Sequence, residues 1–108
     1  MKDPKDCMSM EELRVAIDQH DEVLMAALAR RAEYIDRAVD LKRENGWPAR
    51  IPGRVEEVAL NARRNAEALG YDPDFAETIW RQMIDWSIAR EERAMATDRG
   101  DIDGSNAD

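Results

Sequence analysis

The chain has 108 residues, so it has room for one domain whose core buries a modest share of its surface. A formal net charge of -8 argues against nucleic-acid binding, because neutralising phosphates requires a basic face. The lone Cys7 excludes an internal disulfide, and with a single histidine we expect neither a metal nor a cofactor. There is no signal peptide and no apolar run long enough to cross a bilayer, so we expect a cytoplasmic protein without membrane partners.

The composition is typical of helices with one wet face, since apolar residues make up 44% and charged residues 37% of the chain. Only 5 glycines and 4 prolines interrupt it, which predicts an all-α fold. Residues 1–9 carry Pro4 and no periodicity, so we expect an N-terminal arm there. Ser9 and Glu12 have capping-box spacing, and no proline or glycine follows until Gly46. The sequence therefore predicts a first helix that ends at Asn45 and is roughly 50 Å long.

Two more helices are expected after a connection that contains Pro48. The second fits Gly53 to Leu69, and the third starts at Asp72-Pro73 and runs to about Met95. The helical domain would span residues 10–97, followed by a flexible polar tail over 98–108. The residues expected to face inward are Val55, Val58, Ala62, Ala66 and Leu69 in the second helix, and Phe75, Ile79, Met83, Ile84, Ser87 and Ile88 in the third.

The apolar stripe of the first helix is longer than the second helix can cover. It recurs in steps of three and four over Leu13, Ile17, His20, Leu24, Leu28, Arg31, Ile35, Ala38 and Lys42. A surplus apolar stripe on a small domain is most simply covered by a second copy of the chain. We therefore expect a homodimer.

Two cations, Arg31 and Lys42, interrupt this stripe. They lie 11 residues apart, so they share one face of the helix to within roughly 20°. Arg14 lies about 100° round the helix from Arg31 and some 25 Å away, so it could approach Arg31 only from a partner chain. On pattern alone, the favoured interpretation is that these side chains lay their stems on the apolar surface and put their charges in water. Glu91 extends the buried stripe of the third helix, where the simple interpretation is a structural ion pair.

The spacing of these residues resembles that of a known family, the all-helical (type II) chorismate mutases, over roughly Met10 to Arg93. The residues that carry the resemblance are Leu13-Arg14-x-x-Ile17-Asp18-x-x-Asp21-x-x-Leu24, Leu28-Ala29-Arg30-Arg31, Lys42, Pro48 and Arg54. The resemblance implies a three-helix protomer with a long first helix, in an intertwined homodimer with two shared active sites. It also implies a small dianionic substrate.

The resemblance assigns roles to individual residues. Arg14 of the partner and Arg31 would each bind a substrate carboxylate, and Lys42 would bond the ether oxygen and a carboxylate. Arg54 matches a further carboxylate-binding arginine. Ser87 and Glu91 fall at the family's serine and glutamine positions on the third helix. Ile51 stands where some bacterial mutases have an acidic residue for a substrate hydroxyl, so this chain departs from them there.

The implied reaction is the rearrangement of chorismate to prephenate, which needs no nucleophile and no proton transfer. An enzyme accelerates it by selecting the compact conformer and by placing positive charge at the ether oxygen. An ionised Glu91 would repel the negative charge that develops there. We therefore expect Glu91 to act protonated, with activity that rises toward acid, and a Glu91→Gln variant to be faster at neutral pH.

Two other functions compete with the mutase. Isochorismate pyruvate lyase, which forms salicylate and pyruvate on the same scaffold, shares the Met1-Lys2-x-Pro4-x-x-Cys7 opening and the Ile84-x-Trp86 stretch. A non-catalytic helical dimer that serves as a binding module would be expected to lack one of the three cations, and all three are present. We favour the mutase, because the two substrates differ in hydroxyl position, which few contacts discriminate.

Overall fold

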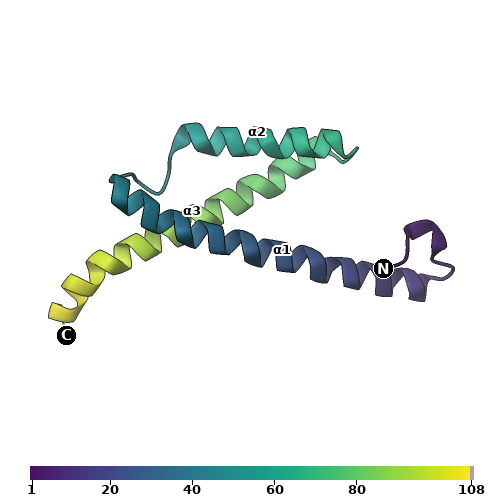
Figure 1. Ribbon diagram of the computed structural model, residues 1–108, viewed down its shortest axis with the longest axis horizontal. Helices are drawn as coiled ribbons and strands as arrows, with labels where there is room; N and C mark the ends of the chain where they lie inside the picture. The colour runs from purple at the N-terminus through teal and green to yellow at the C-terminus, as the bar shows by residue number, and fades with distance from the viewer. Residues whose placement is uncertain (108) are drawn as a thin grey trace. The chain divides into compact units, whose positions relative to one another are not determined.

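Three α-helices make up most of the protein, as a computed structural model shows for residues 1–107, with side chains described as far as residue 96. A short 3-10 helix, Pro4–Asp6, precedes α1 (Met10–Asn45), α2 (Pro52–Ala68) and α3 (Pro73–Ala107) (Figure 1). No strand occurs within residues 1–107, so the predicted all-α fold is confirmed. The chain divides into two compact units between Tyr34 and Ile35, inside α1.

In the first unit, the start of α1 is capped by side chains, as the sequence predicts. The Glu12 N–H donates to the Ser9 hydroxyl at 3.1 Å. The Glu12 carboxylate accepts from the N–H of Met8 at 2.7 Å, one residue earlier than in a standard capping box. Lys2 of the arm pairs with Glu12 at 3.3 Å. The Met8 N–H, and then Lys2, lower the pKa of the Glu12 carboxyl.

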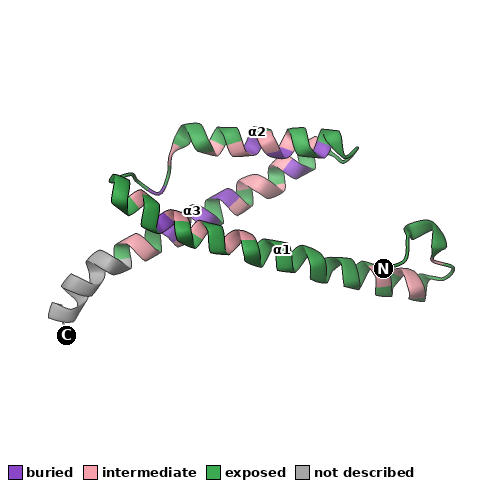
Figure 2. Ribbon diagram, in the orientation of Figure 1, coloured by how far each residue is buried: buried purple, intermediate pink, exposed green. Residues whose placement is uncertain are grey.

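Most of the large apolar side chains of α1 in the first unit lie exposed (Figure 2). Leu24 keeps 56% and Met25 65% of its surface open to solvent. The other large apolar side chains exposed between residues 15 and 28 are Val15, Ile17, Val23 and Leu28. The predicted stripe is therefore present, and within the described part of its own unit it is at most partly covered, as at the half-buried Leu13.

In the second unit, α2 and α3 pack against each other as a helical hairpin (Figure 1). The buried cluster contains Ala49, Ala59, Ile84 and Ile88, and the half-buried Val55, Val58 and Met95 pack on it. The small residues Ala59, Ala62 and Ala66 form the buried side of α2, which lets α3 approach closely. Val39, in the part of α1 that belongs to this unit, is also buried.

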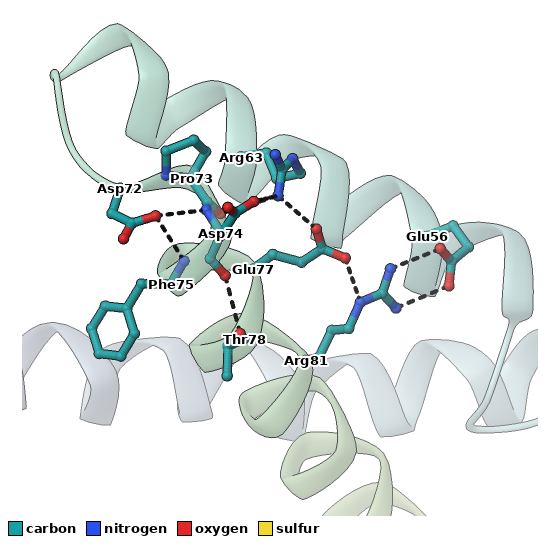
Figure 3. Close-up of polar contacts among 9 residues, drawn as sticks. All are labelled: Glu56, Arg63, Asp72, Pro73, Asp74, Phe75, Glu77, Thr78 and Arg81. Atoms are coloured by element: carbon teal, nitrogen blue, oxygen red, sulfur yellow. Dashed lines mark hydrogen bonds and ion pairs between the residues drawn. The ribbon is translucent and has the colours of Figure 1, made fainter.

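The ends of the helices follow the predicted turn chemistry. Gly70 has a φ of +69°, and the next residue, Tyr71, donates its N–H to the Ala66 carbonyl at 2.8 Å, which closes the end of α2. Asp72 Oδ1 then accepts the N–H groups of Asp74 at 3.0 Å and Phe75 at 3.1 Å, so Asp72 caps α3 (Figure 3). Gly46, with a φ of +70°, follows the end of α1 in the same way.

Two residues at the α2–α3 turn were expected to face inward and do not. Leu69 is 84% exposed, because α2 ends at Ala68, one residue earlier than predicted. Phe75 is 51% exposed, because it lies in the first turn of α3, where its ring meets Tyr71 at 6.3 Å. The other inward predictions for the two helices hold, since those side chains are buried or half-buried.

A chain of ion pairs joins α2 to α3 along the edge of the hairpin (Figure 3). Arg63 Nη1 contacts Asp74 at 2.9 Å and Glu77 at 3.0 Å. Arg81 donates to Glu77 at 2.7 Å and, with both ends of its fork, to Glu56 at 2.9 and 3.1 Å. Arg81, and then Arg63, lower the pKa of the Glu77 carboxyl, while Arg81 lowers that of Glu56.

The helix α3 extends to Ala107, past the end near Met95 that the sequence predicts. Asp108 and the side chains from residue 97 onward lie outside the described residues, so the flexible polar tail stays a prediction. No helix in the described residues combines the length and apolarity needed to cross a membrane.

Candidate active site

The six candidate site residues are divided between the two units. Arg14, which is exposed, and Arg31, which is half-buried, belong to the first unit. The second unit holds Lys42, Arg54, Ser87 and Glu91.

Lys42 and Glu91 come together in the second unit, although 49 residues separate them in sequence. The Lys42 ammonium donates to Glu91 Oε1 at 2.6 Å and to the backbone carbonyl of Ala49, also at 2.6 Å. The side chains keep only 19% (Lys42) and 4% (Glu91) of their surface exposed. Two of the three donors of the ammonium are thus engaged by described residues, and a third can point toward a ligand.

Ser87 lies one helical turn before Glu91 on α3, on the same face. Within the side chains described, Ser87 and Glu91 are the buried polar residues, with 4% and 3% of their surface exposed. They alternate with the buried Ile84 and Ile88 at the spacing that the sequence predicts. Burying a carboxylate is costly unless a cation compensates it, and Lys42 does so here. This face of α3 therefore combines apolar packing with two buried polar groups, one of which, Glu91, is paired with a cation.

Arg54 has a different setting. It lies in the first turn of α2 with its side chain exposed, and its Nη1 donates to Glu57 on the same helix at 2.5 Å. No contact among the described residues joins Arg54 to Lys42 or Glu91. Its substrate-binding role stays a prediction.

Sequence reasoning missed several polar contacts of the second unit, among them one partner of Lys42. The Ala49 carbonyl is a backbone group, so its role as an acceptor cannot be predicted from the residue type. Asp36 binds Arg90 through two hydrogen bonds, of 2.6 and 3.0 Å, which lower the pKa of the Asp36 carboxyl. Arg50 reaches Asp85 at 3.3 Å. These ion pairs join residues 54 and 35 positions apart, and no local pattern connects them.

A shallow recess between the N-terminal arm and the first turns of α1 contains none of the six candidates. Its lining includes Lys2 but also the carboxylates of Glu11 and Glu12. Such an acidic lining does not suit a dianionic ligand. Lys42, paired with Glu91 on the face of α3 that also carries Ser87, is therefore the better candidate site.

The chain belongs to the type II chorismate mutase family, whose sequence model matches residues 13–92. That range contains all six candidate residues, and the family resemblance drawn from the sequence is confirmed. The match adds to the geometry, because Lys42 and Glu91, which the fold brings into contact, both lie inside it.

Proteins of known activity resemble this chain at moderate identity. Isochorismate pyruvate lyase of Pseudomonas aeruginosa is 37% identical over 101 residues, which cover 93% of this chain and 98% of that protein. The T-protein of Enterobacter agglomerans is 34% identical over 79 residues, 73% of this chain but 21% of that protein. The 4-amino-4-deoxychorismate mutase of Streptomyces pristinaespiralis is 30% identical over 88 residues, 82% of this chain and 68% of that protein.

Proposed function

We propose that the protein is a chorismate mutase that converts chorismate to prephenate. The observation that carries the proposal is the Lys42 ammonium, held at 2.6 Å from both Glu91 and the Ala49 carbonyl beside a buried face of α3, in a chain of the chorismate mutase family. Such a fixed charge acts without reorganising when negative charge develops next to it.

The chemistry asks little of the protein beyond binding and electrostatics. In the rearrangement the ether C–O bond breaks while a C–C bond forms, and the electrons move in one ring without a proton donor or acceptor. The ether oxygen carries partial negative charge as its bond breaks. Lys42 would stabilise that charge, and the forked donors of Arg31 would hold a carboxylate and so favour the compact conformer.

We also propose that the functional unit is a homodimer with shared sites. The exposed apolar face of α1 between residues 15 and 28 supports it, because an apolar surface of this extent on a small protein is covered in the working assembly. The occupant that fits is a second copy of the same face, since twofold pairing covers both stripes at once. Arg14, exposed on this segment, would then reach the site of the partner chain.

The Glu91 carboxylate weakens the electrostatic stabilisation that the proposed mechanism requires. Its carboxylate lies 2.6 Å from the ammonium that is to stabilise the ether oxygen, so it competes for that charge. A neutral side chain at position 91 would leave the full charge of Lys42 to the substrate. The proposed role of Glu91 is therefore to orient Lys42 and, in its protonated form, to donate to the ether oxygen.

A second candidate reaction is the release of pyruvate from isochorismate, which leaves salicylate. The observation that favours it is the likeness to the Pseudomonas lyase along 98% of that protein. The same C–O bond type breaks in both reactions, so Lys42 would have the same task. The two candidates differ in substrate and product, not in the residues they need.

One assay with both substrates tests the proposal. Purified protein is given chorismate or isochorismate, and prephenate and pyruvate are measured separately. We expect prephenate formation to be the more efficient reaction. A higher kcat/KM for pyruvate release would replace the mutase with the lyase, and the absence of both products would leave a non-catalytic dimer.

A Lys42→Ala variant tests the role of the cation in the same assay. We expect it to lose about 10²- to 10³-fold in kcat, the usual effect of removing one group that stabilises charge in the transition state. Lys5→Ala is the matched control, because Lys5 is exposed in the N-terminal arm. Full turnover by Lys42→Ala would overturn the proposed mechanism.

A further inference from the structure

Arg90 is the neighbour of Glu91 on α3, and it has its own attachment to α1. Its Nε donates to Asp36 Oδ1 at 2.6 Å and its Nη2 to Asp36 Oδ2 at 3.0 Å, so the guanidinium and the carboxylate form a bidentate ion pair. The guanidinium also lies over the Trp86 ring, 5.4 Å from its centre. Two groups from two helices, the Asp36 carboxylate on α1 and the Trp86 ring on α3, therefore hold the Arg90 side chain.

The two attachments between these helices come from different sides. Neighbouring residues on a helix point about 100° apart, so Arg90 and Glu91 leave α3 in different directions. Asp36 and Lys42 lie about 120° apart around α1 and some 9 Å apart along it. A pair of helices joined at two such points can neither roll nor slide without breaking one of them. Arg43, which donates to the Ala94 carbonyl at 3.1 Å, adds a third point.

The contribution of the Asp36–Arg90 pair to stability should be small. Its side chains are 52% and 41% exposed, and exposed ion pairs contribute little to the free energy of folding. The pair instead constrains the orientation of α3 relative to α1. It is made one residue away from the carboxylate that positions Lys42, and small displacements of a catalytic group have large effects on rate.

We propose that Asp36 and Arg90 are a positioning pair: by fixing the rotation of α3 against α1, they keep Glu91 aimed at Lys42 and so set the direction of the Lys42 ammonium. The part that concerns turnover rests on the proposed function. The part that concerns Lys42 itself does not, because it can be measured without a substrate.

The first measurement is the reactivity of Lys42 toward acetic anhydride, followed by peptide mass spectrometry. The chain has three lysines, so Lys2 and Lys5 in the arm serve as internal references. In the native protein we expect Lys42 to react several-fold more slowly than Lys5, because it is 19% exposed and held by two hydrogen bonds. In Asp36→Asn we expect the ratio of Lys42 to Lys5 labelling to rise by about threefold or more.

Asp40→Asn is the matched control. Asp40 lies on the same helix, its side chain is also 52% exposed, and it pairs with the arginines Arg37 and Arg43. Both arginines belong to α1, and Arg43 contacts Asp40 through Nη1 while its Nη2 donates to the Ala94 carbonyl of α3, so the control removes an exposed ion pair and leaves that bond to α3 in place. We expect its Lys42 labelling to match that of the native protein. Equal labelling ratios in Asp36→Asn and Asp40→Asn would overturn the positioning pair.

The second measurement is the split between kcat and KM. We expect Asp36→Asn to lower kcat by about tenfold while KM changes less than about twofold, because a misdirected ammonium weakens transition-state binding more than substrate binding. The charge-swapped double variant Asp36→Arg/Arg90→Asp should recover both kcat and the protection of Lys42. If Asp36→Asn does not fold, the double variant takes its place in both measurements.

The outcomes separate the two proposals. Native protein that forms neither prephenate nor pyruvate overturns the proposed function, while the labelling ratios still decide the positioning pair. Active native protein with an unchanged kcat in Asp36→Asn overturns the positioning pair and leaves the proposed function in place. A swapped variant that folds but leaves Lys42 as reactive as in Asp36→Asn also counts against the pair.

Discussion

The two units of this chain use the same kind of amphipathic helix in opposite ways. In the second unit the inward side of α3 is covered, with Ile84 and Ile88 each 6% exposed. In the first unit the equivalent side chains of α1 are open, with Leu24 at 56% and Leu28 at 36%. The second unit buries a core of its own, whereas the first presents an apolar face suited to another surface. Apolar periodicity alone therefore predicts that a face will be buried, but not by which chain.

The polar contacts differ between the units in a similar way. In the second unit, ion pairs join different helices, as in Asp36–Arg90, Lys42–Glu91 and Glu56–Arg81. In the first unit the pairs Arg30–Glu33, on one turn of α1, and Lys2–Glu12, between the arm and the same helix, are local. Long-range pairs fix one helix against another, and in the second unit such a pair holds the Lys42 cation against α3.

The largest effect should come from a charge on the open face of α1. Leu24→Asp places a carboxylate where we expect the partner chain, so the dimer should dissociate and turnover should fall by about 10²-fold or more, because each site loses the partner's arginine. Sedimentation and the prephenate assay measure the two effects. Leu69→Asp is the control, since Leu69 is equally apolar and 84% exposed at the α2–α3 turn. Similar behaviour of both variants would contradict the difference between the two faces.

A cavity in the closed core should have the next largest effect. Ile88→Ala removes a side chain that is 6% exposed and lies in the buried cluster with Ala59 and Ile84. We expect the free energy of unfolding in urea to fall by about 2–4 kcal/mol. Ile17 is exposed, so at high protein concentration Ile17→Ala should lower the free energy of unfolding by less than Ile88→Ala does. Its effect should depend more strongly on protein concentration. A loss below about 1 kcal/mol for Ile88→Ala would mean that the core of the second unit is not where the structure has it.

Glu91→Gln should raise turnover. Glutamine retains an oxygen that can accept from Lys42 and removes the charge that competes with the substrate, so we expect kcat at pH 7 to increase about three- to tenfold. Glu92→Gln is the control, because Glu92 is the exposed neighbour of Glu91 on α3. A Glu91→Gln variant that is slower than the native protein would assign the carboxylate itself a catalytic role.

The smallest effect concerns the ion pairs between α2 and α3. The folded-state pKa values of Glu56 and Glu77 are lowered below 4.5, so the unfolded chain binds more protons as the medium becomes acidic. The stabilisation by these pairs is complete above that value and is lost as the pH falls through the lowered folded pKa. In Arg81→Gln the urea midpoint should therefore depend less steeply on pH between 5 and 3.

Salt and a neighbouring arginine provide the controls for this pH dependence. The pairs are partly exposed, so the difference between Arg81→Gln and the native protein should shrink at high ionic strength. Arg64→Gln should leave the pH dependence unchanged, because Arg64 contacts Asn61 on its own helix. An identical pH dependence in all three proteins would show that the network in Figure 3 contributes nothing to stability.

Much of the fold could be predicted from local signals. The capping side chains Ser9 and Asp72 and the positive-φ glycines Gly46 and Gly70 mark helix ends through interactions within a few residues. The spacing of Ser87 and Glu91 on the buried face of α3 followed from periodicity. The exposure of Leu69 and Phe75 could not be predicted from periodicity, because it depends on the residue at which α2 and α3 stop packing against each other.

The candidate site was predictable only in part. Lys42 and Glu91 could be named from the family resemblance, but the Ala49 carbonyl could not, because a backbone acceptor is independent of residue type. The Asp36–Arg90 pair could not be predicted for another reason: it forms only in one relative orientation of α1 and α3. Such contacts depend on tertiary geometry, which sequence patterns do not encode locally.

The most direct test of the shared site is a mixing experiment with two inactive variants, Arg14→Ala and Lys42→Ala. If Arg14 serves the partner's site, each mixed dimer contains one site with both cations intact and one with neither. Unfolding and refolding an equal mixture should then restore about a quarter of the native activity, because about half of the dimers are mixed and each has one working site of two. No recovery of activity in a mixture that sedimentation shows to be dimeric would contradict the claim that one protomer completes the active site of the other.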